Sequence, residues 1–254
     1  MVITKKIVRY INTRQKKIWL SKISEAVTAL RNGDFVLIHD DKNREDEIDM
    51  VVSAENISPR HISVMRRDAG GLICTAISKD LSLKLGLPYM YDILKIFGKS
   101  NQSISLITKD ISPYGDKPSF SITLNHVNTF TGITDYDRAL TISSLSKICK
   151  ELNDEVKDNN AILKEFQNSF MTPGHVPILI ASKGLLNERA GHTELSIFLA
   201  KIANITNVTT ICEMLDSVSY KALSYTDACK YAQNNNIVML DSKDLMTYAN
   251  NINN

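Results

Sequence analysis

The segment DDKNREDEIDM, from Asp40 to Met50, holds six acidic residues and two basic ones between two apolar runs. In an extended backbone the side chains of Glu45, Glu47 and Asp49 project to the same side. Three carboxylates held together repel one another unless a cation lies among them, and oxygen ligands suit a hard divalent ion such as Mg²⁺ or Mn²⁺. A solvated turn is the alternative interpretation, because runs of charge usually face water.

A second polar cluster, NERAGHTE, runs from Asn187 to Glu194. Gly191 ends an approach loop and Thr193 lies where a helix would begin, so free backbone N–H groups there could bind a phosphate. Arg189 could add a forked contact to the same anion, and His192 could give a metal ion an imidazole nitrogen. A plain helix cap with an incidental histidine is the alternative.

Two further residues could move protons. His175 lies between two prolines in the stretch PGHVP and is suited to acid–base work near neutral pH, although such a stretch is also an ordinary turn. Glu213 lies at the end of an apolar strand, where a carboxylate is costly unless it is paired or coordinated. Burial would raise its pKa and suit it to acid–base catalysis, whereas a glutamate that emerges into solvent has no such role.

The composition is that of an ordinary soluble globular protein: the 254-residue chain has 43% hydrophobic residues, 23% charged residues and a net charge of +2. This balance gives no strong attraction to nucleic acid or to a membrane surface. No apolar run approaches the roughly 20 residues that span a bilayer. The stretch MVITKKIVRYINTRQKKIWL lacks the apolar centre of a secretory signal, so we expect a cytoplasmic protein. The four cysteines form no CxxC pair, which argues against a zinc ribbon.

Hydrophobic periodicity predicts interleaved strands and helices. We expect strands over residues 35–39, 50–54, 72–77, 120–124, 176–181, 208–214 and 237–240. We expect helices over residues 21–32, 60–67, 136–150, 193–203 and 226–233, and from 242 onward. Phe120, Ile122 and Leu124 should face the core from their strand, and Asp135 should cap the helix that follows.

The order of these elements indicates the fold class. Strands and helices are interleaved without a strict βα repeat, which favours an α+β protein, a single-domain mixed α/β sandwich, over a Rossmann sheet. The helix over residues 193–203 should be amphipathic. Residues 79–118 are less regular, and Lys150–Asn160 is the most polar stretch and is expected to be a surface linker.

Six blocks in a fixed order resemble the 3,4-dihydroxy-2-butanone 4-phosphate synthase family of riboflavin biosynthesis. They are DDKNREDEIDMVVSAE, DAGGLICTAIS, TGITDYDRALTI, TPGHVPIL, ERAGHTELSIFLAKIA and ICEML, and they span roughly residues 20–245. The resemblance implies one catalytic domain over residues 20–254 after a basic extension over residues 1–19. It also implies a homodimer with active sites near the subunit interface. The implied reaction converts ribulose 5-phosphate to 3,4-dihydroxy-2-butanone 4-phosphate and formate with Mg²⁺ or Mn²⁺, two ions per site.

The resemblance also assigns roles to single residues. It implies Glu45 and His192 as metal ligands and Glu47 as a carboxylate that reaches the metals through water. Arg44 and Asp49 would contact the sugar, with Asp49 as a proton carrier. The remaining implied site residues are the acid–base pair His175 and Glu213, the phosphate-binding Arg189, Ala190, Gly191, His192 and Thr193, and the bordering Cys74.

The sequence departs from the family pattern at two positions. Many members have glycine where Ile48 stands and proline where Ala190 stands. Neither change removes a ligand or a proton carrier, but Ile48 lacks glycine's access to positive φ. Strict alternation would point Arg44 away from Glu45, yet the resemblance places both in one site. We therefore predict that the segment from Arg44 to Asp49 is a bent loop, and that Asp40–Asn43 is turn surface.

Two other functions remain as alternatives. The chain could be an inactive relative or a binding module whose basic N-terminus contacts nucleic acid, although the carboxylates and histidines of the motifs are all retained. It could also be another sugar-phosphate enzyme on the same scaffold, such as an isomerase that stops at the enediolate.

Overall fold

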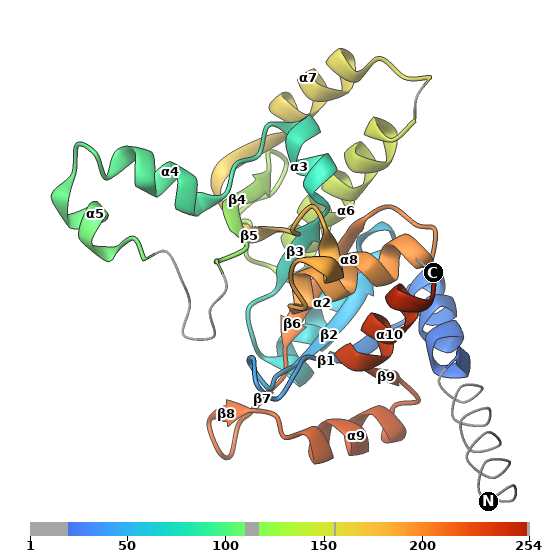
Figure 1. Cartoon of the computed structure of the whole chain (residues 1–254). Coiled ribbons are helices and arrows are strands. Elements are labelled where there is room, and N and C mark those ends of the chain that lie inside the picture. The colour runs from blue at the N-terminus through green and yellow to red at the C-terminus, as the bar shows by residue number, and fades with distance from the viewer. Residues whose placement is uncertain (1–19, 110–116, 155, 253–254) are drawn as a thin grey trace, which may run out of the picture.

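The computed structural model describes residues 20–109, 117–154 and 156–252 (Figure 1). A seven-stranded mixed sheet runs through the molecule, and helices cover both of its faces. This arrangement confirms the expected mixed α/β architecture. The basic extension predicted over residues 1–19 lies outside the described residues.

The strands follow the order β4-β5-β3-β6-β2-β1-β9 across the sheet. Their bounds are β1 (Val36–His39), β2 (Ile48–Ser53), β3 (Cys74–Ile77), β4 (Phe120–His126), β5 (Phe170–Ile180), β6 (Val208–Glu213) and β9 (Val238–Asp241). The pairs β3–β5 and β1–β9 are parallel, and the other neighbours are antiparallel. A small separate ribbon joins β7 (Leu215–Asp216) to β8 (Lys221–Ala222).

Most of the described helices pack in two layers, one on each face of the sheet, whereas α4 and α5 project from it. The described helices are a helix over residues 20–32, α2 (Pro59–Val64), α3 (Lys79–Leu85), α4 (Met90–Phe97), α5 (Gln102–Ile107), α6 (Asp135–Leu152), α7 (Asn159–Ser169), α8 (His192–Ile202), α9 (Tyr225–Asn234) and α10 (Ser242–Ile252). The helix over residues 20–32, α8 and α10 bury apolar side chains on one face of the sheet. The helices α2, α6, α7 and α9 do so on the other face. The sheet therefore separates two hydrophobic cores.

Helix signals in the sequence hold with one correction. Gly33 ends the first helix with φ +81°, and Pro59 opens α2 after Ser58, as expected. Asp135, however, is the first residue of α6 and does not cap it. The cap is Thr134, whose side-chain oxygen accepts a hydrogen bond from the Asp137 N–H.

The expected orientation of β4 is wrong at its start. Phe120 is 43% exposed, whereas Ser121 is 2% exposed and donates a hydrogen bond to the Pro88 carbonyl. The register against β5 shifts twice along β4, once between Phe120 and Thr123 and again between Leu124 and Asn125. Such irregularities change which face a side chain takes, so simple alternation does not predict the buried residues here.

Two helical regions also differ from expectation. Helix α8 is not amphipathic, because all its residues from His192 to Ala200 are buried between the sheet and neighbouring segments. The irregular stretch predicted over residues 79–118 contains α3, α4 and α5, and Figure 1 shows α4 and α5 projecting from the body as an arm. Across the described ranges, no helix combines the length and the apolar character needed to cross a membrane.

Candidate active site

One cavity gathers most of the residues that the sequence singles out. It has a volume of about 250 Å³ and lies where the ends of β2, β3 and β6 meet the start of α8. Its lining residues are Arg44, Glu45, Glu47, Asp49, Cys74, Pro118, Ser119, Phe120, Leu179, Arg189, His192, Thr193, Ile211 and Glu213. The structure therefore brings together nine of the predicted site residues, from segments far apart in the chain.

Residues 40–47, which we call the carboxylate loop, bend sharply before β2. Asp46 adopts a left-handed backbone with φ +54°, and the strand begins only at Ile48. This confirms the predicted bend for Arg44 to Glu47, whereas Ile48 and Asp49, which the prediction placed in the same loop, belong to β2. Ile48 itself lies in the strand and is fully buried, so its departure from glycine does not disturb the path. The unusual backbone angle falls on Asp46, a residue type that tolerates it.

Asp40 was assigned to turn surface, and this assignment is wrong. Only 1% of Asp40 is exposed. Its carboxylate accepts hydrogen bonds from the N–H groups of Glu45 and Glu47 and from Arg44 Nη1, at 3.0–3.1 Å. The Asp40 carboxylate thus stabilises the bent loop, because it accepts hydrogen bonds from backbone N–H groups that the bend leaves without a backbone partner. Of the three remaining turn residues, Lys42 and Asn43 are exposed as expected, and Asp41 is half-buried.

His192 forms the centre of the metal-facing side. Its Nε2 lies 3.3 Å from the Glu47 carbonyl oxygen and can donate a hydrogen bond to it. Its Nδ1 lies 3.4 Å from Glu45 Oε2 and 3.7 Å from Asp49 Oδ1. A carbonyl partner on one ring nitrogen fixes the tautomer and leaves the lone pair of the other for a metal.

The pKa values of Asp49 and His192 are strongly shifted from their ordinary values. The pKa of Asp49 is raised to about 7, mainly by burial and also by the carboxylates of Glu213, Glu45 and Glu47, while His192 opposes the shift. Burial on its own would lower the pKa of His192. The surrounding Asp49, Glu45 and Asp40 carboxylates outweigh that effect and raise it to about 9. Perturbed groups that face one cavity are typical of a functional site.

These shifts predict how the stability of the metal-free protein depends on pH. His192 holds its proton to about pH 9 when folded, against 6.5 for the ordinary side chain. The folded state therefore binds more protons than the unfolded state between these values, so the free energy of unfolding falls as pH rises. We expect a loss approaching about 1 kcal/mol per pH unit. Thermal unfolding of the metal-free protein from pH 6.5 to 9 measures this loss of stability. If the stability of His192→Asn fell equally steeply with pH, the prediction would be contradicted.

The opposite end of the cavity is suited to an anion. Gly191 caps the eleven-residue helix α8, whose first N–H groups have no partner within the helix. Arg189 Nη1 donates hydrogen bonds to the Lys117 carbonyl at 3.0 Å and to Ser119 Oγ. Arg189 Nε lies 3.5 Å from Glu194 Oε2. Any Cβ at position 191 would lie 2.8 Å from Arg44 Nη2, so only glycine lets this guanidinium approach.

Glu194 was not predicted as part of this support. It is fully buried, its Oε1 accepts the Ser182 N–H at 2.9 Å, and burial raises its pKa. An acidic residue in the first turn of an otherwise buried helix was the signal in the sequence, since burial of a carboxylate requires partners.

Glu213 and Cys74 border the reacting part of the cavity. Glu213 stands opposite Asp49 in the β2–β6 ladder, and its Oε2 accepts the Leu72 N–H at 2.8 Å. Gly71 passes so close that a Cβ there would lie 2.5 Å from Glu213 Oε2. Burial raises the pKa of the Cys74 thiol well above its usual range, so this cysteine is a neutral wall of the cavity.

Three predicted residues do not line the cavity. Ala190 and Gly191 lie in the backbone that shapes its anion end. His175 is exposed on β5, four residues and therefore about 13 Å along the strand from the lining residue Leu179. Asn125 holds His175, because its Oδ1 accepts the His175 N–H at 2.8 Å and its Nδ2 lies 3.1 Å from the ring Nδ1.

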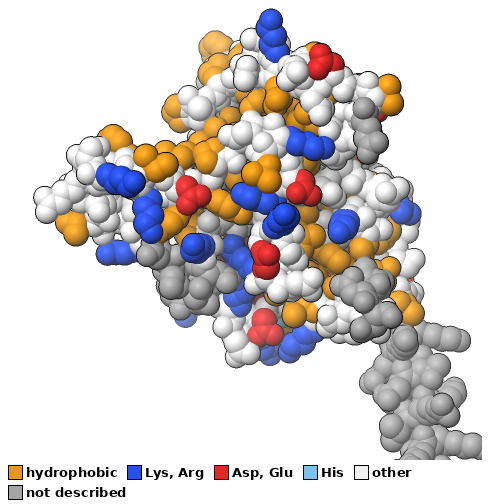
Figure 2. Space-filling view, turned by 45° about the horizontal axis from the view of Figure 1, so that its top comes forward, with side chains coloured by type: hydrophobic (Ala, Val, Ile, Leu, Met, Phe, Trp, Pro, Cys, Tyr) orange, Lys and Arg blue, Asp and Glu red, His pale blue; other side chains and the backbone are white. Residues whose placement is uncertain are grey.

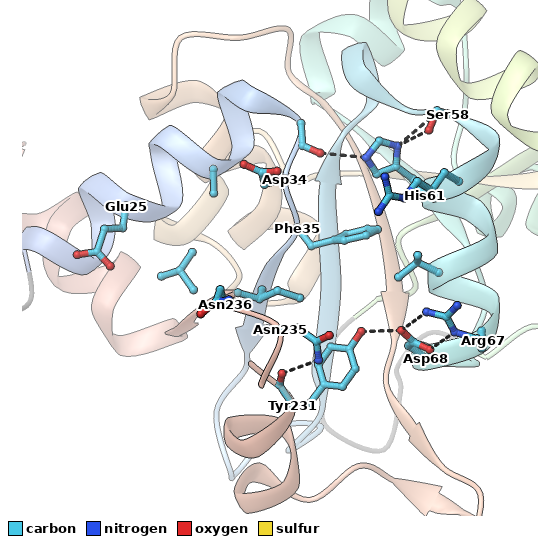
Figure 3. A pocket seen from close by; sticks show the side chains of 16 residues that line it. Glu25, Asp34, Phe35, Ser58, His61, Arg67, Asp68, Tyr231, Asn235 and Asn236 are labelled. Carbon is cyan, nitrogen blue, oxygen red and sulfur yellow. Dashed lines mark hydrogen bonds and ion pairs between the residues drawn. The ribbon is translucent and has the colours of Figure 1, made fainter. Parts of the chain in front are cut away.

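A larger cavity of about 1040 Å³ lies elsewhere, between the helix over residues 20–32, α2 and α9 (Figure 3). Its central polar groups bind one another. Both ring nitrogens of His61 are engaged, by Ser58 and by the Gly33 carbonyl, and the Tyr231 hydroxyl donates to Asp68 at 2.8 Å. These groups form part of the scaffold, so we take the smaller cavity as the active site.

The smaller cavity fits a divalent cation. One ligand atom from each of Asp40, Glu45 and His192 lies within 4.8 Å of the others. Asp49 Oδ1 is buried and has no hydrogen-bond partner among the described residues. Carboxylates with one imidazole are a donor set that suits Mg²⁺ or Mn²⁺.

The fold and the cavity define a mixed α/β protein in which a carboxylate–imidazole pocket lies beside the N-terminus of a helix that suits an anion. A family model described as 3,4-dihydroxy-2-butanone 4-phosphate synthase matches residues 24–248. The chain belongs to this enzyme family of riboflavin biosynthesis.

Individual relatives agree with this assignment. A 3,4-dihydroxy-2-butanone 4-phosphate synthase from Methanothermobacter thermautotrophicus is 45% identical over 224 residues, which cover 88% of this chain and 94% of that protein. The riboflavin biosynthesis protein RibBA of Bacillus velezensis is 31% identical over 91% of this chain and 49% of its own length. A solved 3,4-dihydroxy-2-butanone 4-phosphate synthase in complex with two magnesium ions has the same fold, with a TM-score of 0.71 at 24% identity over 89% of this chain and 95% of that one.

Proposed function

We propose that the protein converts D-ribulose 5-phosphate to 3,4-dihydroxy-2-butanone 4-phosphate and formate, as a lyase. The steps are enolisation, loss of water, skeletal rearrangement and release of one carbon as formate. One observation carries the proposal beyond family membership. Asp49 Oδ1, a buried carboxylate oxygen without a hydrogen-bond partner among the described residues, faces the His192 ring in a cavity that Arg189 and the start of α8 also line. That arrangement suits proton abstraction from a phosphorylated sugar.

The metal-binding residues would be Glu45 and His192, with Asp40 beside them and Glu47 acting through water. The neighbouring solved structure with two magnesium ions supports two Mg²⁺ per site here, and Mn²⁺ would suit the same donors. When bound, the metal would polarise the ketose carbonyl and stabilise negative charge next to it. Metal binding would also displace the proton that His192 otherwise holds.

The substrate would be held at both ends. The phosphate would bind the N–H groups at the start of α8, the Thr193 hydroxyl and the Arg189 guanidinium. Arg44, which lies 3.0 Å from Asp40 and also contacts Glu45, would hold sugar hydroxyls beside the metals. Fixing both ends of a short sugar orients its carbons for a rearrangement.

Proton transfer would fall to Asp49 and Glu213. Asp49 Oδ1 would take the proton from the carbon next to the carbonyl, because no group among the described residues donates a hydrogen bond to it. Glu213, opposite it in the ladder, would serve a later proton transfer. The buried wall of Cys74, Leu179 and Ile211 would keep water away from reactive intermediates.

His175 fits this scheme only if the active protein is a homodimer. The ring lies outside the cavity of its own chain, so we propose that His175 of the partner subunit completes each site. Apolar side chains on the projecting arm support association (Figure 2): Ile96, Phe97, Leu106 and Ile107 are all more than half exposed. Exposed apolar clusters of this kind mark interaction surfaces.

Subunit complementation tests the shared site. His175→Ala and Glu45→Ala should each be inactive as pure proteins. After mixing, unfolding and refolding together, about half of the dimers are mixed and each keeps one intact site, so about one quarter of wild-type activity should return. Mixing either variant with itself is the control, and no recovery in the mixture would show that His175 acts within its own chain or not at all.

Formate release tests the reaction itself. Wild-type protein incubated with ribulose 5-phosphate should release formate, lose the activity in EDTA and regain it with Mg²⁺. Carbon NMR of the product separates this lyase from an isomerase that stops at the enediolate. A folded, metal-loaded protein that leaves the sugar unchanged would overturn the proposal.

A further inference from the structure

A buried histidine connects the carboxylate loop to β9, the edge strand next to β1. His39 ends β1, and only 6% of its side chain is exposed. Its Nε2 lies 3.0 Å from Asp46 Oδ1 in the loop, and its Nδ1 lies 3.0 Å from Asp241 Oδ1 at the end of β9. Either ring nitrogen that carries a hydrogen can donate it to the carboxylate it faces. The ring is therefore a bridge between two carboxylates.

The bridge is anchored firmly at the β9 side. His39 and Asp241 are register partners on parallel neighbouring strands. The other oxygen of Asp241 accepts the Tyr225 hydroxyl at 3.2 Å, and the Tyr225 ring packs edge-on against the His39 ring at 4.9 Å. The position of the imidazole is thus set by the sheet and by α9, independently of the carboxylate loop.

The loop side of the bridge holds a strained residue. Asp46 has φ +54°, a left-handed conformation that costs about 1 kcal/mol or more for most residues other than glycine, although Asp adopts it more readily than most. Its side chain is 56% exposed, so packing does not hold it in place. The contact with His39 opposes this strain directly.

Asp46 stands between two residues of the metal-facing side. The Glu45 carboxylate lies 3.4 Å from His192 Nδ1, and the Glu47 carbonyl lies 3.3 Å from His192 Nε2. Asp40 holds the loop from the inside through the N–H groups of Glu45 and Glu47. Asp46 is the one residue between Glu45 and Glu47 in the chain. The conformation of its backbone therefore helps to set the angle between those two residues.

We propose that His39 is a positioning residue for the metal site, which holds Asp46 in its left-handed conformation and thereby aims Glu45 and the Glu47 carbonyl at His192. This inference rests on the proposed metal role of Glu45 and His192, and it adds a residue that touches neither metal nor substrate. Outer partners of metal ligands typically change metal affinity or activity by about 10- to 100-fold when they are removed.

Direct Mn²⁺ binding tests the proposal. Electron paramagnetic resonance on the full chain, freed of metal and titrated with Mn²⁺ alone, gives a dissociation constant without catalysis. We expect His39→Phe, which keeps an aromatic ring against Tyr225 but removes both nitrogens, to weaken Mn²⁺ binding by about tenfold. Asp46→Ala should do the same, and because its side chain is half exposed this variant should fold.

Conservative replacements separate the hydrogen bond from the backbone effect. Asp46→Asn keeps an acceptor oxygen and tolerates the left-handed conformation, so it should bind Mn²⁺ nearly as well as wild type. Asp46→Gly accepts that conformation but cannot reach His39, so it should resemble Asp46→Ala. If Asp46→Asn and Asp46→Ala weaken Mn²⁺ binding equally, the hydrogen bond between His39 and Asp46 does not explain the effect.

His61→Phe is the matched control. His61 also uses both ring nitrogens, and its ring packs edge-on against Phe35 at 5.4 Å, but it lines the large cavity away from the loop. It should lower the unfolding temperature without changing Mn²⁺ affinity. Wild-type Mn²⁺ affinity in both His39→Phe and Asp46→Ala would overturn the positioning role.

Formate release, measured in parallel, keeps the two proposals apart. If wild type binds Mn²⁺ and the variants bind it weakly, but no protein releases formate, the positioning role stands and the proposed reaction fails. If all variants release formate and bind Mn²⁺ like wild type, the reaction stands and the role of His39 fails. A wild-type protein that does not bind Mn²⁺ would overturn both.

Discussion

Replacing Glu45 by glutamine should abolish measurable Mn²⁺ binding and lower kcat/KM for formate release by about 10³-fold, which is about 4 kcal/mol of transition-state stabilisation. The substitution keeps the size of the side chain and removes its charge. Glu45 Oε2 lies 3.4 Å from His192 Nδ1, so the loss falls on the two groups that would hold the metal. Excess Mg²⁺ should restore little of the activity, because a ligand is missing.

Two other glutamates make this prediction specific. Glu188→Gln alters an exposed glutamate next to Arg189 that does not line the cavity, and it should leave Mn²⁺ binding and activity unchanged. Glu47→Gln should cost less than Glu45→Gln, by about tenfold in affinity, since the proposed role of Glu47 is to reach the metal only through water. Tight Mn²⁺ binding in Glu45→Gln would place the metal elsewhere in the molecule.

Replacing Asp49 by asparagine should lower kcat by about 10³-fold while Mn²⁺ binding is largely kept. Asp49 is 2% exposed, and its Oδ1 has no hydrogen-bond partner in the described part of the chain. Asparagine fills the same space but cannot take a proton from the substrate. The KM for ribulose 5-phosphate should change little, because in the proposed binding mode Arg189 and the start of α8 hold the phosphate and Asp49 does not.

Separate measurements of kcat, KM and Mn²⁺ affinity distinguish Asp49 from Glu45. A proton carrier affects kcat alone, whereas a metal ligand affects metal affinity first. Asp80→Asn, in the exposed first turn of α3, is the matched carboxylate-to-amide control and should behave like wild type. Full activity in Asp49→Asn would leave Glu213 or His175 as the base.

The sequence motifs and the family resemblance named nine of the residues that line this cavity, because those residues lie in short local motifs. The helix start at Gly191 and the strand end at Glu213 follow from local composition, and the bend before Ile48 followed from asking how Arg44 and Glu45 could share a site. Asp40 was missed for a physical reason. A charged run looks uniformly solvated, and only the folded loop shows that one carboxylate is turned inward to satisfy two backbone N–H groups.

Long-range features could not be predicted in the same way. The bridge from His39 to Asp241 joins residues about 200 positions apart, and only the parallel pairing of β1 with β9 makes them neighbours. The position of His175 outside the cavity depends on how far β5 extends before Leu179 toward its start at Phe170. Two register shifts in β4 alter that part of the sheet. Sequence periodicity does not encode such shifts.

The distribution of the site between sheet and loop has a consequence for its kinetics. Asp49 and Glu213 belong to central, paired strands, whose amide hydrogens should exchange only when the whole domain unfolds. Glu45 belongs to a surface loop held by a few side-chain contacts, which can open without disturbing the sheet. Metal exchange should therefore proceed through brief local opening, many times faster than global unfolding, while Asp49 and Glu213 stay in place to receive the next ion.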